Sequence, residues 1–575
     1  MTKTVRIPEA TLVWDAWESW AEREPRREAV VHWDVLNEPF RWSYGELVRA
    51  ALGVAGRLLE AGVDTGDVCA TILRHHRDFY PVYLGICAIG ALPAVLAYPN
   101  DRLHPEKFVQ GLKGMSQRSG LNWILTEKDL AATLRPLVEA EGSSVGGTFY
   151  PFEWDSSINV SGIVEEARVK RARVRRTDPV LLQHSSGTTG LQKPVVLSHE
   201  AVLGHAARYA SAVGLHPEDK VVSWLPLYHD MGLIAAFHMP LVCGIPSVQL
   251  DPFQWVSAPL IFLEALAQEK GSVSWLPNFA YNILAARISD AEAKDLDLSS
   301  VRLLVNCSEP IRAESHDRLI RRLGPAGLRR EALSGCYAMA ETVFAVTQTA
   351  PGREASRLFA DGEALQQGEW RPPREGKAAR TCVSSGVPIA DCEVRIVDGS
   401  GAAQPADRIG EVAIRSASLF DGYRNYPEKT AEVLRDGWYY SGDLGFIHDG
   451  ELYVIGREKD VIIVAGKNLY PEDVEDAVGG VAGVIPGRVV AFGVESAEDG
   501  TEQVWVAAET TVEGTDARRR LILAIKQAAM AIDVTLSQVH LLPARWLIKS
   551  SAGKPSRKAN QERLLNRDVS ALGGD

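Results

Sequence analysis

Short apolar runs alternate with amphipathic segments along the chain. Runs with the length of buried strands occur at residues 68–73, 123–125, 180–183 and 221–225. Between such runs, apolar residues recur at helical spacing over residues 44–62, 105–115 and 199–213. This alternation predicts an α/β fold with parallel or mixed sheets covered by helices.

One apolar stretch is long enough to suggest a membrane span. Residues 79–100 carry no charged side chain. Gly85, Gly90 and Pro93 interrupt the stretch, and residues 94–97 have the composition of a buried strand. We therefore predict a buried helix, a turn and a core strand here, and no membrane span.

A loop of small residues, 184–194, follows the apolar run at 180–183. Between His184 and Lys193 it contains Ser185, Ser186, Gly187, Thr188, Thr189 and Gly190. The backbone N–H groups and hydroxyls of such a loop can surround a polyphosphate, and the lysine adds a cation. The loop differs from the common P-loop, because no Ser or Thr follows Lys193. The alternative is a flexible surface turn.

Composition narrows the classes of partner. The net charge of -12 disfavours a nucleic-acid surface, which needs clustered Lys and Arg. It leaves room for a local basic patch that binds an acidic carrier protein. The seven cysteines are scattered and form no C-x-x-C pair, which favours a reducing cytoplasm over a disulfide framework or a zinc site.

Further candidate residues stand apart in the sequence. Ser308 and Glu309 follow an apolar run, and Tyr337 could stack on a nucleobase. Glu341 could hold Mg²⁺, which prefers one or two carboxylates together with phosphate oxygens. Asp443, after an expected tight turn, could accept hydrogen bonds from both ribose hydroxyls. The alternatives are a core tyrosine and surface carboxylates.

The order of these motifs resembles that of the adenylate-forming superfamily of acyl-CoA synthetases, luciferases and adenylation domains. Six motifs follow the family's order over most of the chain: 184–193, 224–233, 337–342, 440–443, 456–460 and 551–554. The resemblance implies that a carboxylic acid is activated with ATP and Mg²⁺ and that pyrophosphate is released.

The resemblance also implies roles for single residues. Residues 185–190 and Lys193 would hold the β- and γ-phosphates, and Lys554 would bridge the carboxylate and the α-phosphate. Further nucleotide contacts would come from Ser308, Glu309, Tyr337, Ala338, Met339, Ala340, Thr342, Asp443 and Arg457. Glu341 and Thr188 would bind Mg²⁺. His229 would lie near the reacting carboxylate in a positional role, since acid activation with ATP requires no base.

Within the superfamily the chain is most similar to fatty acyl-AMP ligases. Residues 224–233 and 277–281 have the form typical of that branch, and an extra polar segment at about 354–380 stands where the branch carries an insertion. In the family the insertion impedes the domain movement needed for thioester formation with coenzyme A. The acyl group then passes to the phosphopantetheine of an acyl carrier protein. The alternatives are an acyl-CoA synthetase and a stand-alone amino-acid adenylation enzyme.

The resemblance implies two domains joined by a hinge. The N-terminal adenylation domain would span residues 1–456, the hinge 457–460 would contain Lys459 and Asp460, and residues 461–575 would form a small mobile α+β domain that carries Lys554. Strand patterns at 488–494 and 503–509 and a helical pattern at 518–532 suit the small domain.

Two departures from the family pattern matter. Pro194 follows Lys193 in place of a glycine, which stiffens the phosphate loop. Trp275 and Leu276 stand where fatty acyl-AMP ligases often have two glycines. The family resemblance implies that Trp275, Leu276, Asn278 and His229 line the acyl pocket. In that case the large side chains of Trp275 and Leu276 shorten or redirect the pocket. We then expect medium-chain, branched or functionalised acids; the alternative is a Trp275 that lies in the core away from substrate.

Overall fold

The computed structural model describes most of the chain. The described residues are 5, 7–99, 116, 119–139, 143–154, 161–184, 193–376, 379–464, 467–496, 501–549 and 555–566. The helix predicted at 105–115, the phosphate-loop residues 185–190 and Lys554 lie outside them.

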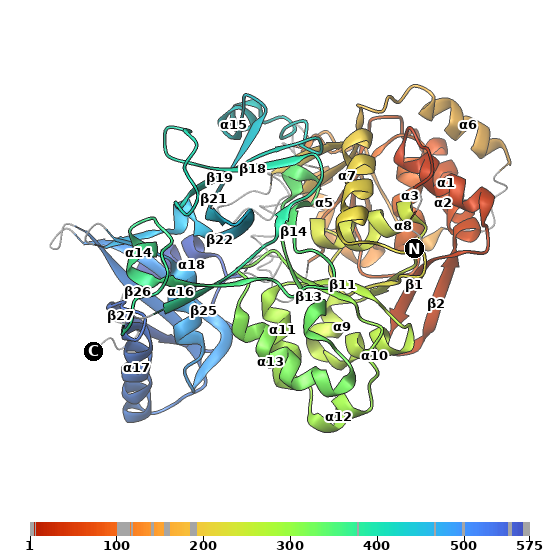
Figure 1. Cartoon of the computed structure of the whole chain (residues 1–575). Helices are drawn as coiled ribbons and strands as arrows, with labels where there is room; N and C mark the ends of the chain where they lie inside the picture. The colour runs from red at the N-terminus through yellow and green to blue at the C-terminus, as the bar shows by residue number, and fades with distance from the viewer. Residues whose placement is uncertain are drawn as a thin grey trace.

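A nine-stranded mixed sheet forms the centre of the large N-terminal part (Figure 1). Its order is β17 (Val387–Pro388), β14 (Ala345–Gln348), β13 (Leu333–Ala338), β12 (Leu303–Asn306), β11 (Val273–Leu276), β9 (Val221–Ser223), β10 (Ser247–Leu250), β1 (Glu28–Asp34) and β2 (Asn37–Ser43). The strands from β13 to β1 pair in parallel, and antiparallel strands close both edges.

A six-stranded sheet lies beside the first. Its order is β6 (Gly147–Phe149), β5 (Trp123–Thr126), β3 (Val68–Ile72), β4 (Leu92–Val95), β7 (Pro179–His184) and β8 (Pro194–Ser198). All pairs are parallel except β7 with β8. The antiparallel pairing sets His184 opposite Pro194, so both ends of the phosphate-loop segment are fixed in one hairpin.

Helices cover both faces of the nine-stranded sheet. Figure 1 shows one group on one side of it: α9 (Pro252–Ser257), α10 (Leu260–Gln268), α11 (Asn278–Arg287), α12 (Asp290–Lys294) and α13 (Ala313–Leu323). The other helices of this part are α1 (Val13–Arg23), α2 (Tyr44–Glu60), α3 (Phe79–Ala88), α5 (Ala131–Val138), α6 (Ser161–Arg171), α7 (His199–Ala212) and α8 (Met239–Cys243).

The apolar stretch 79–100 belongs to the core. All ten residues of α3 and all four of β4 are buried, which confirms the prediction of a buried helix followed by a core strand. Within the described residues, none of the helices has the length and apolar character that crossing a membrane requires.

A third sheet connects the large part to the chain's last segment. It contains β18 (Cys392–Val397), β19 (Gly410–Ser416), β21 (Trp438–His448), β20 (Leu434–Arg435) and β22 (Glu451–Arg457), with α15 (Pro427–Val433) beside it. The extra segment at 354–380 is a hairpin of β15 (Arg357–Asp361) and β16 (Ala379–Val383) with the short helix α14 (Gly362–Gln366) between them.

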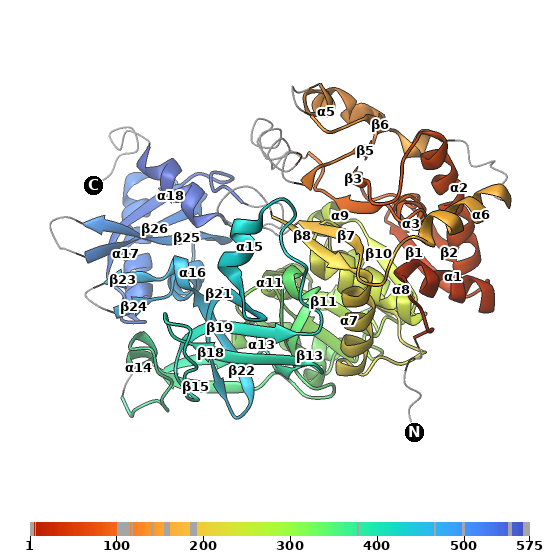
Figure 2. The same cartoon turned by 90° about the horizontal axis from the view of Figure 1, so that it is seen from above.

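The C-terminal part has its own sheet and core. The strands β25 (Val484–Ser496), β26 (Thr501–Thr510) and β27 (Leu536–Leu542) form the sheet, and β23 (Ile462–Val464) pairs with β24 (Lys467–Leu469). The helices are α16 (Pro471–Gly479), α17 (Thr515–Met530) and α18 (Arg557–Leu565). A separate apolar cluster runs from Ile462 to Leu541. Figure 2 shows this part at one end of the molecule, beside α14 and the third sheet.

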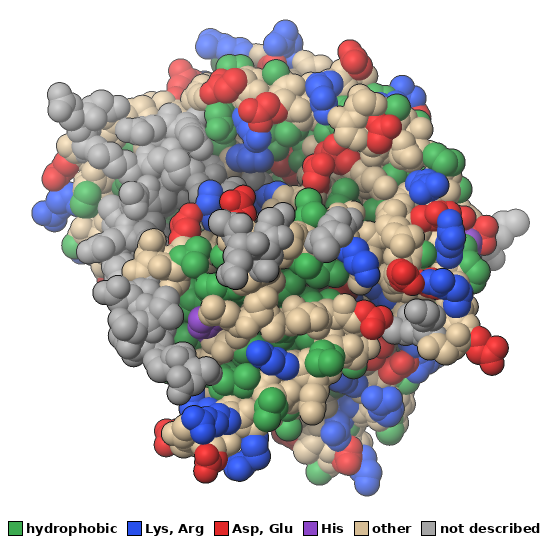
Figure 3. Space-filling model, turned by 90° about the vertical axis from the view of Figure 1, so that its left-hand side faces the viewer, with side chains coloured by type: hydrophobic (Ala, Val, Ile, Leu, Met, Phe, Trp, Pro, Cys, Tyr) green, Lys and Arg blue, Asp and Glu red, His purple; other side chains and the backbone are tan. Residues whose placement is uncertain are grey.

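Acidic and basic side chains are interspersed on the face that Figure 3 shows, so neither sign forms one large field there.

Candidate functional site

Two of the predicted site residues, Ser308 and Tyr337, lie at the carboxyl ends of the central parallel strands. β12 ends at Asn306, and the next residues lead to Ser308; β13 carries Tyr337 near its end. Asn306 pairs in register with Gly335, so these two segments leave the sheet side by side. Ligands of open α/β sheets bind at this edge. Ser308 has a φ of 70°, a conformation that is rare for a residue with a side chain and is often retained at functional sites.

The first polar cluster joins Tyr337, Asp443 and Arg457. The Tyr337 hydroxyl donates to Asp443 Oδ2 at 2.6 Å, and Arg457 Nε lies 3.0 Å from Asp443 Oδ1. Burial and the charge of Asp443 raise the pKa of Tyr337, so the phenol keeps its proton. Each carboxylate oxygen has two acceptor positions, so Asp443 retains capacity for hydroxyl donors such as those of a ribose.

Asp443 does not follow a tight turn; that expectation is wrong. It lies inside the eleven-residue strand β21, directly after Gly442, which has a φ of 70°. The register between β19 and β21 shifts in this region, as at a β-bulge. Bulges re-aim side chains, and this one lies beside the contact of Asp443 with Tyr337.

The second polar cluster joins Glu341, Tyr423 and Lys193. The Tyr423 hydroxyl donates to Glu341 Oε1 at 2.7 Å, and Lys193 Nζ lies 4.8 Å from the centroid of the Tyr423 ring. Glu341 is 6% exposed. Backbone bonds between β8 and residues 421–424 hold Tyr423 and Lys193 together, among them Val196 N to Gly422 O and Arg424 N to Pro194 O.

Cations converge between the two clusters. Burial lowers the pKa of Lys193, and the nearby charges of Lys429 and Arg457 lower it further, whereas Glu341 opposes them. Burial also lowers the pKa of Lys459, with contributions from Arg457 and Lys193. These cations repel one another, so a bound anion of high charge, such as a polyphosphate, would stabilise them.

The residues between Tyr337 and Phe344 form a tight backbone turn. The turn Ala340–Thr342 is 3₁₀-helical, and Val343 after it has a φ of 68°. The Thr342 hydroxyl lies 3.1 Å from Met339 O and 2.9 Å from Phe344 O, so it stabilises the turn itself. Ala338 and Met339 are half-buried beside Tyr337.

Glu309 lies in the segment that follows β12. It accepts the backbone N–H of Phe279 at 2.9 Å and so joins that segment to the start of α11.

His229 lies at the entrance of a π-helix, Met231–His238. Its Nδ1 is 2.6 Å from Asp230 Oδ1, and the same carboxylate oxygen accepts the N–H of Met231 at 2.8 Å. Single turns of π-helix often occur at functional sites. The imidazole orientation is therefore fixed by a carboxylate that is itself held by the helix end.

At the start of the phosphate loop, His184 is buried and neutral. Its Nε2 lies 2.9 Å from Ser119 Oγ, and burial lowers the pKa of His184 to about 4. The predicted contacts of residues 185–190, including the metal ligand Thr188, and those of Lys554 lie outside the described residues and stay predictions.

Of the residues expected at the acyl pocket, Trp275, Leu276 and Asn278 are buried and His229 is half-buried. Trp275 and Leu276 are 0% exposed. Asn278 has its polar atoms engaged inside the protein: Nδ2 donates to Ser315 Oγ, and Oδ1 accepts from Asn306 Nδ2 and from the N–H of Arg312.

A model of the family described as AMP-binding enzyme matches residues 17–424 of this chain, which is more than half of its 575 residues. The chain belongs to the AMP-binding enzyme family. Membership of this family supports ATP as the nucleotide substrate.

Similar proteins cover nearly the whole chain. The Mycobacterium tuberculosis protein Rv1013 is 30% identical over 92% of this chain and 95% of its own length. The medium-chain-fatty-acid–[acyl-carrier-protein] ligase JamA of Moorena producens is 28% identical over 91% of this chain and 90% of its own. A solved structure from a study of fatty acyl-adenylate ligases of E. coli and L. pneumophila has the same fold, with a TM-score of 0.88, 24% identity, and coverage of 97% and 99% of the two chains.

Several important contacts of this AMP-binding enzyme were not predicted. Tyr423 binds Glu341 across 82 residues of sequence. Arg312 and Arg380 of the large part both approach Asp473 of α16, at 3.3 and 2.8 Å. No local sequence pattern marks them, because each depends on segments that meet only in the folded chain.

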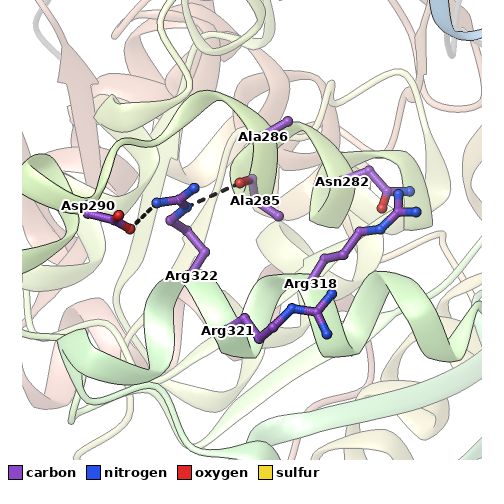
Figure 4. A pocket seen from close by; sticks show the side chains of 7 residues that line it. All are labelled: Asn282, Ala285, Ala286, Asp290, Arg318, Arg321 and Arg322. Atoms are coloured by element: carbon purple, nitrogen blue, oxygen red, sulfur yellow. Dashed lines mark hydrogen bonds and ion pairs between the residues drawn. The ribbon is translucent and has the colours of Figure 1, made fainter. Parts of the chain in front are cut away.

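A separate groove lies between α11 and α13. It has a volume of about 300 Å³ and is lined by Asn282, Ala285, Ala286, Asp290, Arg318, Arg321 and Arg322. Figure 4 shows Arg322 extending from Ala285 O to Asp290, with Arg318 beside Asn282. None of the predicted site residues lines this groove, so the two polar clusters are a different region of the molecule.

Proposed function

We propose that this enzyme activates a carboxylic acid with ATP to an acyl-adenylate and then transfers the acyl group to the phosphopantetheine thiol of an acyl carrier protein. The single observation that carries the first step is the convergence of Lys193, Lys459 and Arg457 beside two buried carboxylates, Glu341 and Asp443. Membership of the AMP-binding enzyme family supports it.

The chemistry of the first step explains why cations are needed. A carboxylate oxygen of the acid attacks the α-phosphorus, the bond from that phosphorus to the bridging oxygen breaks, and pyrophosphate leaves with the electron pair. Two anions must approach each other, so fixed positive charges lower the barrier. Loss of one such preorganised donor typically costs about 10²- to 10³-fold in rate.

Each cluster has its own binding role. Asp443 would accept hydrogen bonds from the ribose hydroxyls, and Arg457 and Tyr337 hold its carboxylate in place. Ser308 and Glu309, together with Tyr337, would frame the adenine. Lys193, with residues 185–190, would hold the departing pyrophosphate. Tyr423 orients Glu341, and His229 would lie beside the reacting carboxylate.

Mg²⁺ fits the carboxylate Glu341. In the described part of the chain no three His, Cys, Asp or Glu side chains gather to hold a metal. Mg²⁺ commonly takes one or two protein carboxylates and completes its shell with phosphate oxygens and water. Bound there with Thr188, it would neutralise charge on the phosphates.

The contacts of the 354–380 hairpin support a carrier protein as acceptor. Its residues Ala360 and Leu365, with Cys382 just beyond it in β16, share a buried cluster with Tyr470 of the small C-terminal part, and α14 contacts β24. Such contacts oppose rotation of a small domain about a hinge at Lys459 and Asp460. In the second step the carrier thiolate attacks the acyl carbon, and AMP leaves. The main alternative is an acyl-CoA synthetase, in which coenzyme A supplies the thiol.

Half-reaction assays test this proposal. We expect the purified enzyme to exchange pyrophosphate with ATP when a suitable acid is present, and to label a phosphopantetheine-loaded carrier protein faster than it forms an acyl-CoA. Efficient thioester formation with coenzyme A would favour the alternative, and no exchange with any acid would contradict the proposal.

Lys554→Ala is the decisive variant for the adenylation step. We expect it to lose at least about 10²-fold in acid-dependent exchange, because a cation at the α-phosphate would be missing. Lys558→Ala, an exposed lysine four residues further on, is the matched control and should keep its activity. Equal activity of the two variants would remove Lys554 from the mechanism.

Seven unpaired, buried cysteines also support a cytoplasmic location, where thiols stay reduced.

A further inference from the structure

The groove between α11 and α13 carries an excess of positive charge. Arg318, Arg321 and Arg322 lie three and four residues apart on α13, so their side chains share one face of that helix. Among the described residues that line the groove, Asp290 alone is acidic. Two positive charges therefore remain in excess here, although the net charge of the chain is -12.

One of the three arginines holds the groove together. Arg322 Nε donates to Ala285 O at 3.3 Å, and the same guanidinium pairs with Asp290 (Figure 4). Arg322 therefore links α13 to α11 and to the start of α12, and its charge is compensated inside the protein.

The other two arginines are exposed and uncompensated. Arg318 and Arg321 both lie at the surface, and within the described part of the chain neither forms an ion pair. Like charges at this helical spacing repel each other, so a bound group with carboxylates would stabilise both arginines. The α11 wall of the groove is low, because Ala285 and Ala286 have small side chains and Ala286 is exposed. The groove is therefore open to the surface of another protein.

The groove extends from the edge of the sheet that carries the candidate nucleotide site. α11 starts at Asn278, directly after β11 and Pro277, and α13 starts at Ala313, five residues after Ser308. Arg318 lies five residues into α13, about 7.5 Å along the helix axis from its start. A protein bound in the groove would thus lie close to the edge at which the acyl-adenylate is expected, and none of the residues of the two polar clusters lines the groove.

Charge and shape together favour one kind of anionic partner. A nucleic acid is a long polyanion, which the negative net charge of this chain would repel outside the groove. An acidic carrier protein presents carboxylates over a short stretch of surface, so the two arginines can pair with it while the rest of the chain stays out of contact. The small apolar side chains of Ala285 and Ala286 leave room for the partner's side chains between the helices.

We propose that the groove between α11 and α13 docks the acidic face of the acyl carrier protein, whose carboxylates pair with Arg318 and Arg321. This inference rests on the proposed acyl transfer and identifies the surface that the partner uses. The two arginines bind the partner and have no contact with the reacting atoms.

Carrier acylation kinetics test the docking site. We would measure kcat/KM for a purified phosphopantetheine-loaded acyl carrier protein, with an acid that supports pyrophosphate exchange, for the wild type and for Arg318→Glu/Arg321→Glu. We expect the charge reversal to lower this kcat/KM by about tenfold or more, because each exposed ion pair contributes up to about fivefold and like charges then repel the partner. The loss should appear in the KM for the carrier, and acid-dependent pyrophosphate exchange should stay at the wild-type rate.

Two further variants separate docking from a general effect of surface charge. Arg318→Gln/Arg321→Gln removes the charges without reversing them and should raise the KM for the carrier by less. Arg23→Glu/Arg26→Glu is the matched control, because Arg23 and Arg26 are exposed and have the same sequence spacing; it should keep the wild-type KM. Higher ionic strength should raise the KM of the wild type more than that of the charge-reversed variant.

Different results overturn the two proposals. A wild-type KM for the carrier in both groove variants contradicts the docking site, as does an equal loss in the control pair or a parallel loss of pyrophosphate exchange. The proposed acyl transfer fails on the wild type alone, if it labels no carrier protein or labels coenzyme A more efficiently, and the docking site is then rejected with it.

Discussion

At the scale of single residues, Asp443 holds the first polar cluster together. It accepts the Tyr337 hydroxyl and pairs with Arg457. We expect Asp443→Asn to raise the KM for ATP by about tenfold to a hundredfold, because hydrogen bonds to a charged group contribute about 1.5–3 kcal/mol. Pyrophosphate exchange at varied ATP concentrations measures this effect.

Asp407 provides the control for Asp443. It accepts His448 Nδ1 at 2.7 Å near the other end of β21, and it is not a predicted nucleotide contact. Asp407→Asn should leave the KM for ATP unchanged. A normal KM in Asp443→Asn would exclude Asp443 from nucleotide binding.

Sequence reasoning at this scale identified residue types but missed some partners. A carboxylate in the 440–443 motif indicates a ribose acceptor, and the structure adds that Tyr337 is its hydrogen-bond donor. Tyr423 lies outside all six family motifs, yet its hydroxyl donates a hydrogen bond to Glu341. Its position depends on the pairing of residues 421–424 with β8, which periodicity does not reveal.

At the scale of elements, an ion pair joins the 354–380 hairpin to α16, and we propose that this contact opposes rotation of the small domain. Arg380 Nη1 lies 2.8 Å from Asp473 Oδ2, and its guanidinium is 5.4 Å from the Tyr470 ring. We expect Arg380→Gln to increase acyl-CoA formation by up to about fivefold, which corresponds to loss of up to about 1 kcal/mol of restraint from a half-buried ion pair. Thioester formation with coenzyme A measures the change.

Arg374 is the matched control in the same hairpin. It pairs with Asp361 and Glu363 inside the hairpin. Arg374→Gln should therefore form no more acyl-CoA than the wild type. If the two variants behave alike, the ion pair to Asp473 has no part in excluding coenzyme A.

The length and spacing of the apolar runs predicted those helices whose apolar face packs against the core. The helical pattern at 44–62 corresponds to α2, and that at 199–213 to α7. Backbone irregularities were not predictable in this way: the bulge at Gly442 interrupts a long strand, and the π-helix at Met231–His238 follows an apolar run. Both depend on the partners across the sheet rather than on the local residues.

At the scale of the whole molecule, buried histidines make stability depend on pH. Burial lowers the pKa of eight histidines. The pKa falls to about 3 for His32, His205 and His238 and to about 4 for His75, His184 and His199, and it is also lowered for His316 and His540. The unfolded chain binds more protons than the folded one between about pH 4 and 6.5. With respect to these histidines, the free energy of unfolding is therefore highest above pH 6.5, and it decreases as the pH falls toward 4.

We therefore expect the thermal midpoint to fall steeply as the pH is lowered from 6.5 to 4. Each such histidine contributes up to about 1.4 kcal/mol per pH unit in that range. His238→Gln should reduce the slope by about one proton. Unfolding followed by fluorescence or calorimetry across this range measures the slopes, and a slope equal to that of the wild type would contradict the assignment.

The shared cluster around Tyr470 has a consequence for protein engineering. Tyr470 follows the proposed hinge, yet it packs with Ala360, Leu365 and Cys382 of the hairpin and with Phe446 of β21. A C-terminal unit cut at the hinge would expose this apolar surface, and a foreign unit joined there would meet a surface shaped for another partner. Chimeras between such enzymes should therefore take the hairpin and the C-terminal unit from the same parent enzyme.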